Sequence, residues 1–232
     1  MIEKIRNFFL KNQHNLKEIL YAQIFRDSIQ DIAWLKNKNF SLSGGAANYS
    51  FIYFLFRILN EIKPKKILEC GIGQTSKLSS QYAAYYPEIS LKLIEHNTKW
   101  LSFFKEQISL SENIEFITPE TKEVIYKNKK TNSYIELSNK IGNNLFDLII
   151  IDGPEGSERY SRIYAVELTL SHLSKSFVII IDDCDRKGEM ETARECMRVL
   201  KRKSINFDYF FVYGIKKQCI IMSPDYQFLK TL

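Results

Sequence analysis

Histidine and cysteine, the side chains that most often hold zinc or act as nucleophile and base, are scarce in this sequence. The 232 residues include three histidines and four cysteines. No two cysteines form a Cys-x-x-Cys pair, so neither a zinc site nor a disulfide framework is expected, and reduced, buried thiols are favoured. No Ser-His-Asp spacing indicates a hydrolase.

Long apolar segments are missing as well. The run Phe51–Phe56 is much shorter than the ~20 residues that a helix needs to cross a membrane. The N-terminal segment Met1–Arg6 carries charge early and has no long apolar core, so no signal peptide is expected. These absences predict a cytoplasmic protein without a membrane span.

Positive charge is in excess but dispersed. The formal net charge is +6, yet the lysines gather only in small groups such as Lys63–Lys66 and Lys201–Lys203. Such spacing favours solvated faces and helix ends over a nucleic-acid surface. A nucleic-acid partner is therefore not expected. An RNA substrate remains an alternative on the net charge alone.

The most informative segment is Ile67–Ser76, with the sequence Ile-Leu-Glu-Cys-Gly-Ile-Gly-Gln-Thr-Ser. An apolar run typical of a strand ends at Glu69, a turn containing Gly71 and Gly73 follows, and helical character begins near Ser76. Glycines permit a close approach of backbone to a ligand. A strand, a glycine turn and a helix start together predict a nucleotide-type binding corner in an open α/β sheet.

Beyond residue 65, predicted strands and helices alternate. Strands are expected at 66–69, 91–95, 114–118, 146–151 and 177–181, and helices at 76–85, 98–109, 159–173 and 189–201. Segments 209–213 and 218–222 are close enough to pair as an antiparallel hairpin. This alternation predicts a parallel sheet covered by helices on both faces.

Two regions depart from this alternation. The N-terminal part is expected to form a helix over 1–36, which the polar residues 12–15 could divide, and a second helix over 46–62 that Pro64 ends. The loop between them ends in Ser43–Gly45, either as a simple connection or against a ligand. Residues 122–137 are expected to form a hairpin insertion whose connection is Asn128–Asn132.

Five strand–helix units closed by an antiparallel hairpin resemble the class I S-adenosylmethionine-dependent methyltransferases. The resemblance covers about residues 60–223. It implies a Rossmann-like seven-stranded α/β sheet whose last strand inserts antiparallel between the fifth and sixth. It divides the chain into an N-terminal helical cap, 1–62, and an S-adenosylmethionine-binding domain, 63–232.

In that family an acidic residue and a glycine-x-glycine turn hold the methionine end of S-adenosylmethionine. By this resemblance Glu69, Gly71 and Gly73 are cofactor-binding residues. The third glycine of the family is replaced here by Thr75. Because Thr75 and Ser76 can hydrogen-bond at the helix start, both are also expected at the cofactor.

The acidic residue that ends the second strand holds the ribose hydroxyls in this family. Glu95 occupies that place about 20 residues beyond the glycine turn, and a carboxylate can accept from both hydroxyls. The next residue, His96, is expected on the adenosine side. Thr118, Pro119 and Glu120 follow the third strand, where the family contacts adenine, and the sequence does not choose among them.

Carboxylates follow the fourth and fifth strands, at Asp152 and at the pair Asp182 and Asp183. Both strand ends lie at the sheet edge where open α/β folds bind ligands. The pattern resembles the metal-dependent sugar O-methyltransferases, which implies that these three residues hold Mg²⁺. Asp152 is also the predicted catalytic residue, as metal ligand or base.

The turn Asp152-Gly-Pro-Glu-Gly156 differs from the metal-dependent enzymes and resembles the xylan glucuronic-acid O-methyltransferase-like group. Glu155 replaces the lysine of the catechol branch, and Pro154 replaces the second acid of the macrolide branch. Arg159, Arg162 and Arg186 are either surface charges or a grip for a carboxylate or phosphate on the substrate.

The predicted function is S-adenosylmethionine-dependent O-methylation of a saccharide or another small hydroxyl acceptor, which could be anionic. Besides RNA methylation, the alternatives are an aminopropyl transferase and a non-catalytic protein that keeps the fold. The sequence leaves a homo-oligomer open.

Overall fold

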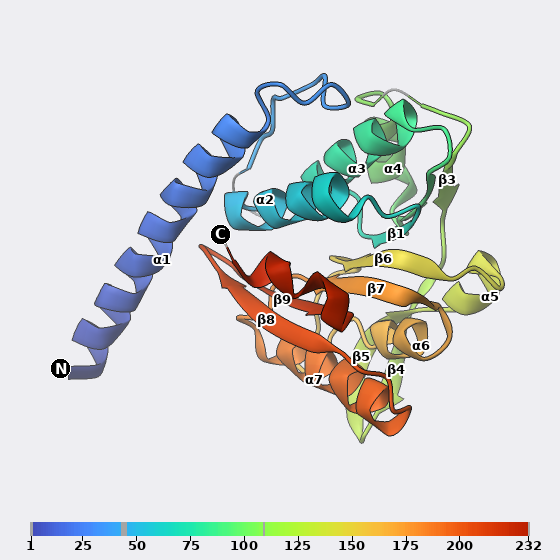
Figure 1. Cartoon of the computed structure of the whole chain (residues 1–232). Coiled ribbons are helices and arrows are strands. Elements are labelled where there is room, and N and C mark those ends of the chain that lie inside the picture. Colours follow the sequence, from blue (N-terminus) through green and yellow to red (C-terminus); the bar gives the residue numbers. More distant parts are fainter. Residues whose placement is uncertain (1, 43–45, 109, 232) are drawn as a thin grey trace.

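A single seven-stranded sheet forms the centre of the structure, a computed structural model that describes residues 2–42, 46–108 and 110–231 (Figure 1). The strand order is β3-β2-β1-β6-β7-β9-β8. Its strands are β1 (Lys66–Cys70), β2 (Ser90–Ile94), β3 (Ile114–Ile117), β6 (Phe146–Ile151), β7 (Leu173–Ile181), β8 (Asp208–Tyr213) and β9 (Lys217–Met222). Because β9 pairs antiparallel with both β7 and β8, the predicted Rossmann-like sheet with an antiparallel last strand is confirmed.

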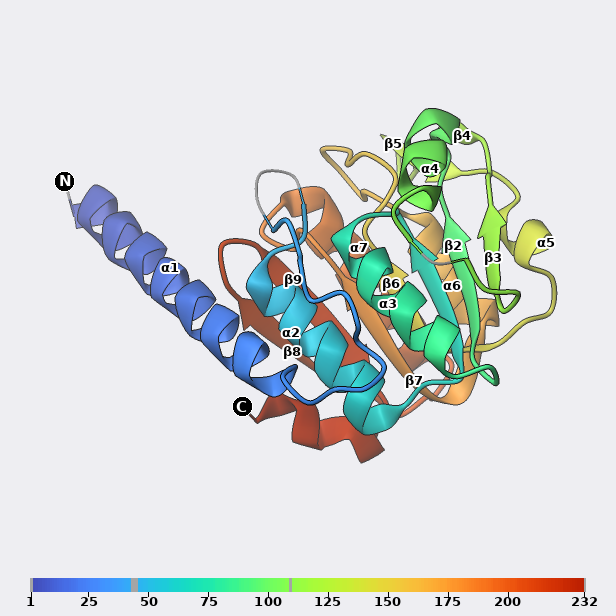
Figure 2. The ribbon, with the colours of Figure 1, turned by 90° about the horizontal axis from the view of Figure 1, so that it is seen from above.

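Helices cover both faces of the sheet (Figure 2). They are α1 (Ile2–Ser28), α2 (Tyr49–Arg57), α3 (Gln74–Tyr85), α4 (Thr98–Lys105), α5 (Leu137–Ile141), α6 (Tyr164–Ser171) and α7 (Lys187–Arg202), with a 3₁₀ segment, η2, at Pro224–Lys230. Side chains of α2, α3 and α4 pack in one apolar core and those of α5, α6 and α7 in another. The sheet therefore lies between two layers of helices.

The central strands are buried on both sides. Ile149 and Ile151 pack in the core beneath α6 and α7, whereas Ile150 packs in the core beneath α2 and α3. A parallel strand covered on both faces needs apolar side chains at every position, which explains the continuous apolar runs of β6 and β7. All four cysteines are buried and unpaired.

The N-terminal region departs from the prediction. The helix α1 is continuous through residues 12–15, and it ends at Ser28 instead of reaching residue 36. Helix α2 continues as a π-helical turn, η1 (Ile58–Ile62), and stops at Lys63, which has a left-handed φ of 57°, just before Pro64 as predicted. The predicted Ser43–Gly45 connection lies outside the described residues.

Helix α1 packs on the domain through only one part of its surface. Tyr21 and Phe25 are buried, while Leu16, Ile19 and Leu20 are exposed, so part of the predicted apolar face is not covered. Figures 1 and 2 show the N-terminal half of α1 extending beyond the other elements. A homo-oligomer stays a prediction. Among the described residues, no helix has the length and apolarity required to cross a membrane.

The insertion forms a separate two-stranded sheet, as predicted, from β4 (Thr121–Tyr126) and β5 (Lys129–Tyr134). Its connection was placed wrongly: the turn is only Lys127–Asn128, and both residues have positive φ values of 47° and 61°, the geometry of a two-residue hairpin. Residues after Tyr134 lead into the short helix α5, which the sequence did not indicate.

We predict that the N-terminal cap and the sheet unfold together, because Phe25 of α1 lies in the same core as the sheet and contacts the rings of Phe40 and Phe56. Phe25→Ala should lower the free energy of unfolding by about 3–5 kcal/mol, measured by urea denaturation followed by circular dichroism. Leu16→Ala, at a 67% exposed position, is the control and should change it by no more than about 0.5 kcal/mol. Two separate transitions in the unmutated protein would contradict the shared core.

Candidate functional site

A cavity of about 630 Å³ lies at the carboxyl ends of β1, β2 and β6, the edge at which open α/β sheets bind ligands. Another cavity, of about 490 Å³, lies near Trp34 and Tyr85, and no carboxylate or imidazole is among its described lining residues. The cavity at the strand ends has both. Its wall includes Gly71, Ile72, Gly73, Gln74, Glu95, His96 and Trp100 on one side and Asp152, Gly153, Pro154, Arg162, Asp183 and Arg186 on the other.

The two glycines of the predicted turn have different roles. Gly71 has a φ of +93°, and a Cβ there would lie 2.6 Å from the backbone nitrogen of Gly153. The turn after β1 therefore presses directly against the loop after β6, which only glycine allows. Around Gly73 no atom lies within 4 Å of an added Cβ, so this residue leaves the cavity open.

Glu69, Thr75 and Ser76 are not in the cavity wall, although the sequence placed them at the cofactor. Glu69 is completely buried, and its two carboxylate oxygens accept hydrogen bonds of 2.6 Å from the hydroxyls of Ser76 and Ser79. Burial raises the pKa of Glu69, and these hydroxyls only partly oppose the shift. Its carboxyl group thus anchors the start of α3 behind the glycine turn.

Glu95 and His96, the residues expected at the ribose and on the adenosine side, both lie in the cavity wall. The oxygens of Glu95 accept from the backbone nitrogens of Ile72, at 3.3 Å, and Asn97, at 2.7 Å. These bonds fix the carboxylate at the cavity, and each oxygen keeps a second lone pair for a ligand. Nδ1 of His96 lies 3.1 Å from Oε1 of Glu95 without the alignment of a hydrogen bond.

Trp100, on α4, is a wall residue that the sequence did not indicate. Its indole nitrogen donates to the carbonyl of Ile72 at 2.7 Å, and 42% of the residue is exposed. The fixed, open ring offers a stacking surface for an aromatic ligand. Thr118, Pro119 and Glu120 are not among the lining residues of this cavity, so none of these adenine candidates lies at it.

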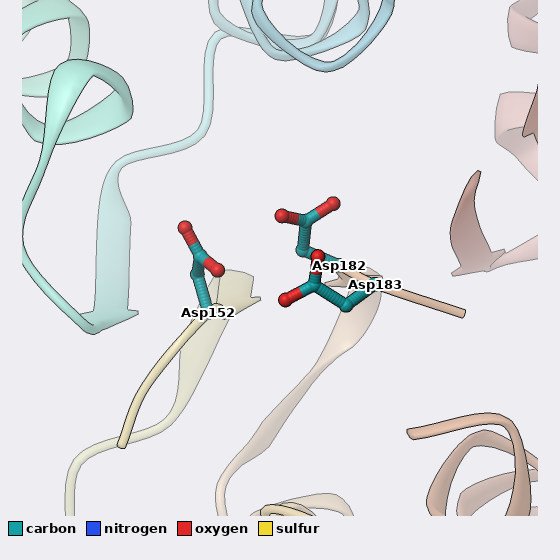
Figure 3. A group of neighbouring side chains, drawn as sticks. All are labelled: Asp152, Asp182 and Asp183. Atoms are coloured by element: carbon teal, nitrogen blue, oxygen red, sulfur yellow. The ribbon is translucent and has the colours of Figure 1, made fainter. Parts of the chain in front are cut away.

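Asp152, Asp182 and Asp183 come together as predicted. Figure 3 shows Asp152 at the end of β6 beside Asp182 and Asp183 at the end of β7. One carboxylate oxygen from each lies within 4.8 Å of the others. Asp183 has a left-handed φ of 58°, a strained conformation for a non-glycine residue that is common in functional sites.

Three cationic side chains contact these carboxylates. Nη2 of Arg162 lies 3.5 Å from Asp152 and 3.0 Å from Asp183. Nζ of Lys216 lies 3.5 Å from Asp182 and 3.3 Å from Asp183, and Nη1 of Arg186 lies 3.3 Å from Asp183. These three cations offset the negative charges of the cluster, and Arg186 also lies 3.6 Å from Oε1 of the buried Glu189.

The electrostatics of the site follow from burial. Burial, and then the charge of Asp182, raise the pKa of Asp152 well above its usual value, and burial followed by the charge of Asp183 raises the pKa of Asp182. Burial alone would lower the pKa of Arg162, but Asp152 and Asp183 raise it above its usual value. Arg162 thus stays charged, while Asp152 is a stronger base than an exposed carboxylate.

The oxygen atoms of the three aspartates have the type and spacing that Mg²⁺ uses, but the rest of the site does not suit an ion. The Lys216 ammonium already contacts Asp182 and Asp183, and the Arg162 guanidinium lies between Asp152 and Asp183. A divalent ion would have to displace at least one of them. The arrangement therefore does not fit the predicted magnesium site.

The arginines differ in position. Arg159 pairs with Glu191 of α7, with Nη2 to Oε1 at 2.6 Å, and is not among the cavity residues. Arg162 is buried under the acid cluster and also donates to the carbonyl of Pro154 at 3.3 Å. Only Arg186, whose side chain is 53% exposed, lies in the wall with donors that remain accessible.

Lys216 and Gln218 are site residues that the sequence missed. Register explains their position: β9 runs antiparallel to β7, with Cys219 opposite Ile181, so the residues before Cys219 lie beside those after Ile181. Gln218 donates to Oδ1 of Asp182 at 2.7 Å. The sequence could have indicated the contacts of Lys216 and Gln218 only if the predicted antiparallel pairing had been continued beyond the strand ends, residue by residue.

Comparison with known proteins identifies the fold. A protein assigned as a caffeoyl-CoA O-methyltransferase from Staphylococcus aureus aligns over 90% of this chain and 100% of its own, with a TM-score of 0.59 and 14% identity. An O-methyltransferase assigned in Klebsiella pneumoniae aligns over 92% and 98%, with a TM-score of 0.57 and 14% identity. The O-methyltransferase TomG of Streptomyces achromogenes, in complex with S-adenosylmethionine, aligns over 92% and 98%, with a TM-score of 0.51 and 11% identity.

These likenesses show that the chain has the class I methyltransferase fold, as its strand order indicates. No protein-family model matches the sequence, and no curated protein matches it.

The contact between Gly71 and Gly153 gives a matched pair of variants. Gly71→Ala should lower the free energy of unfolding by about 1–3 kcal/mol. The added methyl group would clash with the backbone of Gly153, and the φ of this residue is left-handed. Gly73→Ala, in open space, should cost about 1 kcal/mol or less. Urea denaturation of both measures the difference, and equal destabilisation would contradict the assigned contact.

Proposed function

We propose that the protein is an S-adenosylmethionine-dependent methyltransferase that methylates a hydroxyl group of a small acceptor. The observation that carries the proposal is one cavity with two chemically different sides. Its first side combines the open glycine turn, Glu95 and Trp100, and its second side contains Asp152, Arg162 and Asp183. The three solved structures compared above are O-methyltransferases by their own descriptions, and one of them has S-adenosylmethionine bound.

The first side suits the methyl donor. Glu95, already held by two backbone nitrogens, can accept from ribose hydroxyls through its remaining lone pairs. The Trp100 ring offers a face for adenine, and His96 lies in the same cavity wall. Gly73 leaves room for the methionine part. Glu69 and Ser76 contribute by holding the start of α3, which supplies the backbone of the same wall.

The second side suits the acceptor. Asp152 keeps part of its side chain at the cavity, and burial raises its pKa, which makes its carboxylate a stronger base toward the proton of an acceptor hydroxyl. As that proton leaves, the acceptor oxygen forms a bond to the methyl carbon and the carbon–sulfur bond breaks. S-adenosylhomocysteine departs as a neutral thioether. Asp152 is then neutral, and Arg162 stays paired with the Asp183 carboxylate.

A saccharide is the acceptor class that we propose. Carboxylates such as Asp152 and Asp183 accept hydrogen bonds from sugar hydroxyls, and the accessible donors of Arg186 suit a carboxylate or phosphate on the same molecule. The turn Asp152–Gly156, similar to that of the xylan glucuronic-acid O-methyltransferase-like group, supports an acidic sugar. The four reduced cysteines agree with action in the cytoplasm.

Isothermal titration calorimetry with S-adenosylmethionine tests the donor side. The unmutated protein should bind one equivalent. Glu95→Gln, which removes the charge but keeps the shape, should weaken binding about 10- to 100-fold. Asp152→Asn is the control on the acceptor side and should keep the dissociation constant within about threefold. Absence of binding by the unmutated protein would refute the proposal.

Transfer of a labelled methyl group to a panel of neutral and acidic saccharides tests the acceptor side. Asp152→Asn should reduce turnover by about 10²- to 10⁴-fold, because the proton acceptor is lost. Glu95→Gln should regain much of its activity at high S-adenosylmethionine concentration. If the protein binds S-adenosylmethionine but methylates no hydroxyl compound, the non-catalytic alternative is favoured.

A further inference from the structure

We propose that Lys216 provides internally the positive charge that a divalent cation would bring to the acid cluster, so that removing Lys216 turns the cluster into a cation-binding site. Lys216 is not among the residues that line the cavity. It is therefore a positioning residue, which acts through Asp182 and Asp183. Its role in methylation rests on the proposed function, but its effect on cation binding does not.

The contacts of Lys216 are those expected of such a counter-ion. Its Nζ lies 3.5 Å from Oδ2 of Asp182 and 3.3 Å from Oδ1 of Asp183. Oδ2 of Asp182 is buried and receives no hydrogen bond from the described residues, so the nearby ammonium is its main compensation. Only 15% of the Lys216 side chain is exposed, unlike the usual solvated lysine.

Charge accounts for the exclusion of a cation. Asp152, Asp182 and Asp183 carry three negative charges, and Arg162, Arg186 and Lys216 carry three positive charges within ion-pair distance of them. Unit charges a few ångströms apart in a partly buried site interact strongly. A divalent cation would meet the ammonium of Lys216, whereas without Lys216 the cluster would have one more uncompensated negative charge.

The turn that carries Lys216 is held in place by α1. Oε2 of Glu18 accepts from the backbone nitrogen of Ile215 at 3.2 Å. The same carboxylate accepts from the side chain of Asn48 at 2.8 Å. A Cβ on Gly214 would lie 2.1 Å from Glu18 and 2.4 Å from Ser50, so the turn has no spare room. The contacts with Glu18 and Ser50 therefore fix the backbone position of this turn.

A buried polar chain links this support to the acids. Gln218 donates both to Oδ1 of Asn48, at 3.0 Å, and to Oδ1 of Asp182, at 2.7 Å. Asn48 in turn contacts Glu18, and Asn48, Gln218, Glu18 and Asp182 are all buried. Buried polar networks with satisfied partners favour one arrangement, so the Lys216 turn and Asp182 keep a fixed relation.

Binding of Mn²⁺, followed by electron paramagnetic resonance with the metal-free full chain, tests the inference without an acceptor. Lys216→Ala should bind one Mn²⁺ at least about tenfold more tightly than the unmutated protein, since the competing charge is gone. Adding Asp182→Asn to that variant should abolish the gain. Lys216→Arg, which keeps the charge, should behave like the unmutated protein.

Lys217→Ala is the matched control. It also removes one lysine charge, at the next residue, but the Lys217 side chain lies over the Phe211 ring. It should leave Mn²⁺ binding unchanged. Tight stoichiometric Mn²⁺ binding by the unmutated protein would overturn the inference, and so would equal affinity in the unmutated protein and Lys216→Ala. Thermal unfolding of each variant confirms that it is folded.

Titration of the same samples with S-adenosylmethionine separates this inference from the proposed function. Lys216→Ala should bind S-adenosylmethionine within about threefold of the unmutated affinity, because Lys216 is absent from the cavity wall. If no sample binds S-adenosylmethionine, the proposed function fails while the Mn²⁺ comparison still decides the role of Lys216.

Discussion

The gathering of three carboxyl groups within 4.8 Å of one another, two of them buried and Asp152 half-buried, is the constraint on which the rest of the site depends. Such a cluster is unfavourable unless cations lie against it. The chain supplies them from three places: Arg162 from the loop after β6, Arg186 from the start of α7, and Lys216 from the β8–β9 turn. The surrounding elements are arranged to bring these charges to the ends of β6 and β7.

Close packing holds those elements in place. Gly71 and Gly153 bring the loops after β1 and β6 into backbone contact, which joins the proposed donor side of the cavity to the proposed acceptor side. The β4–β5 hairpin supports the loop that carries Arg162, since Thr131 donates to the carbonyl of Tyr160 at 2.9 Å and the backbone nitrogen of Asn132 donates to Ser157 at 2.9 Å. The insertion thus has a structural role at the site.

The sequence was sufficient for the parts of the fold that depend on local pattern. Apolar runs and glycine turns located the strands and placed Asp152, Asp182 and Asp183 at one edge, and the family resemblance supplied the antiparallel last strand and the position of Glu95. The sequence was insufficient where tertiary contacts decide. Glu69 turned inward to the Ser76 and Ser79 hydroxyls, and Lys216 reached the acids only through antiparallel register. Neither contact can be predicted from the spacing of residues along the chain.

A crystal structure of the protein with S-adenosylhomocysteine tests the central claim, a single cavity with a donor side and an acceptor side, most directly. The ligand should lie along Gly73, with its ribose hydroxyls at Glu95, its adenine at Trp100 and its sulfur facing Asp152. Lys216 should remain between Asp182 and Asp183. A ligand bound in the cavity near Trp34 and Tyr85, or with its sulfur turned away from Asp152, would contradict the assignment.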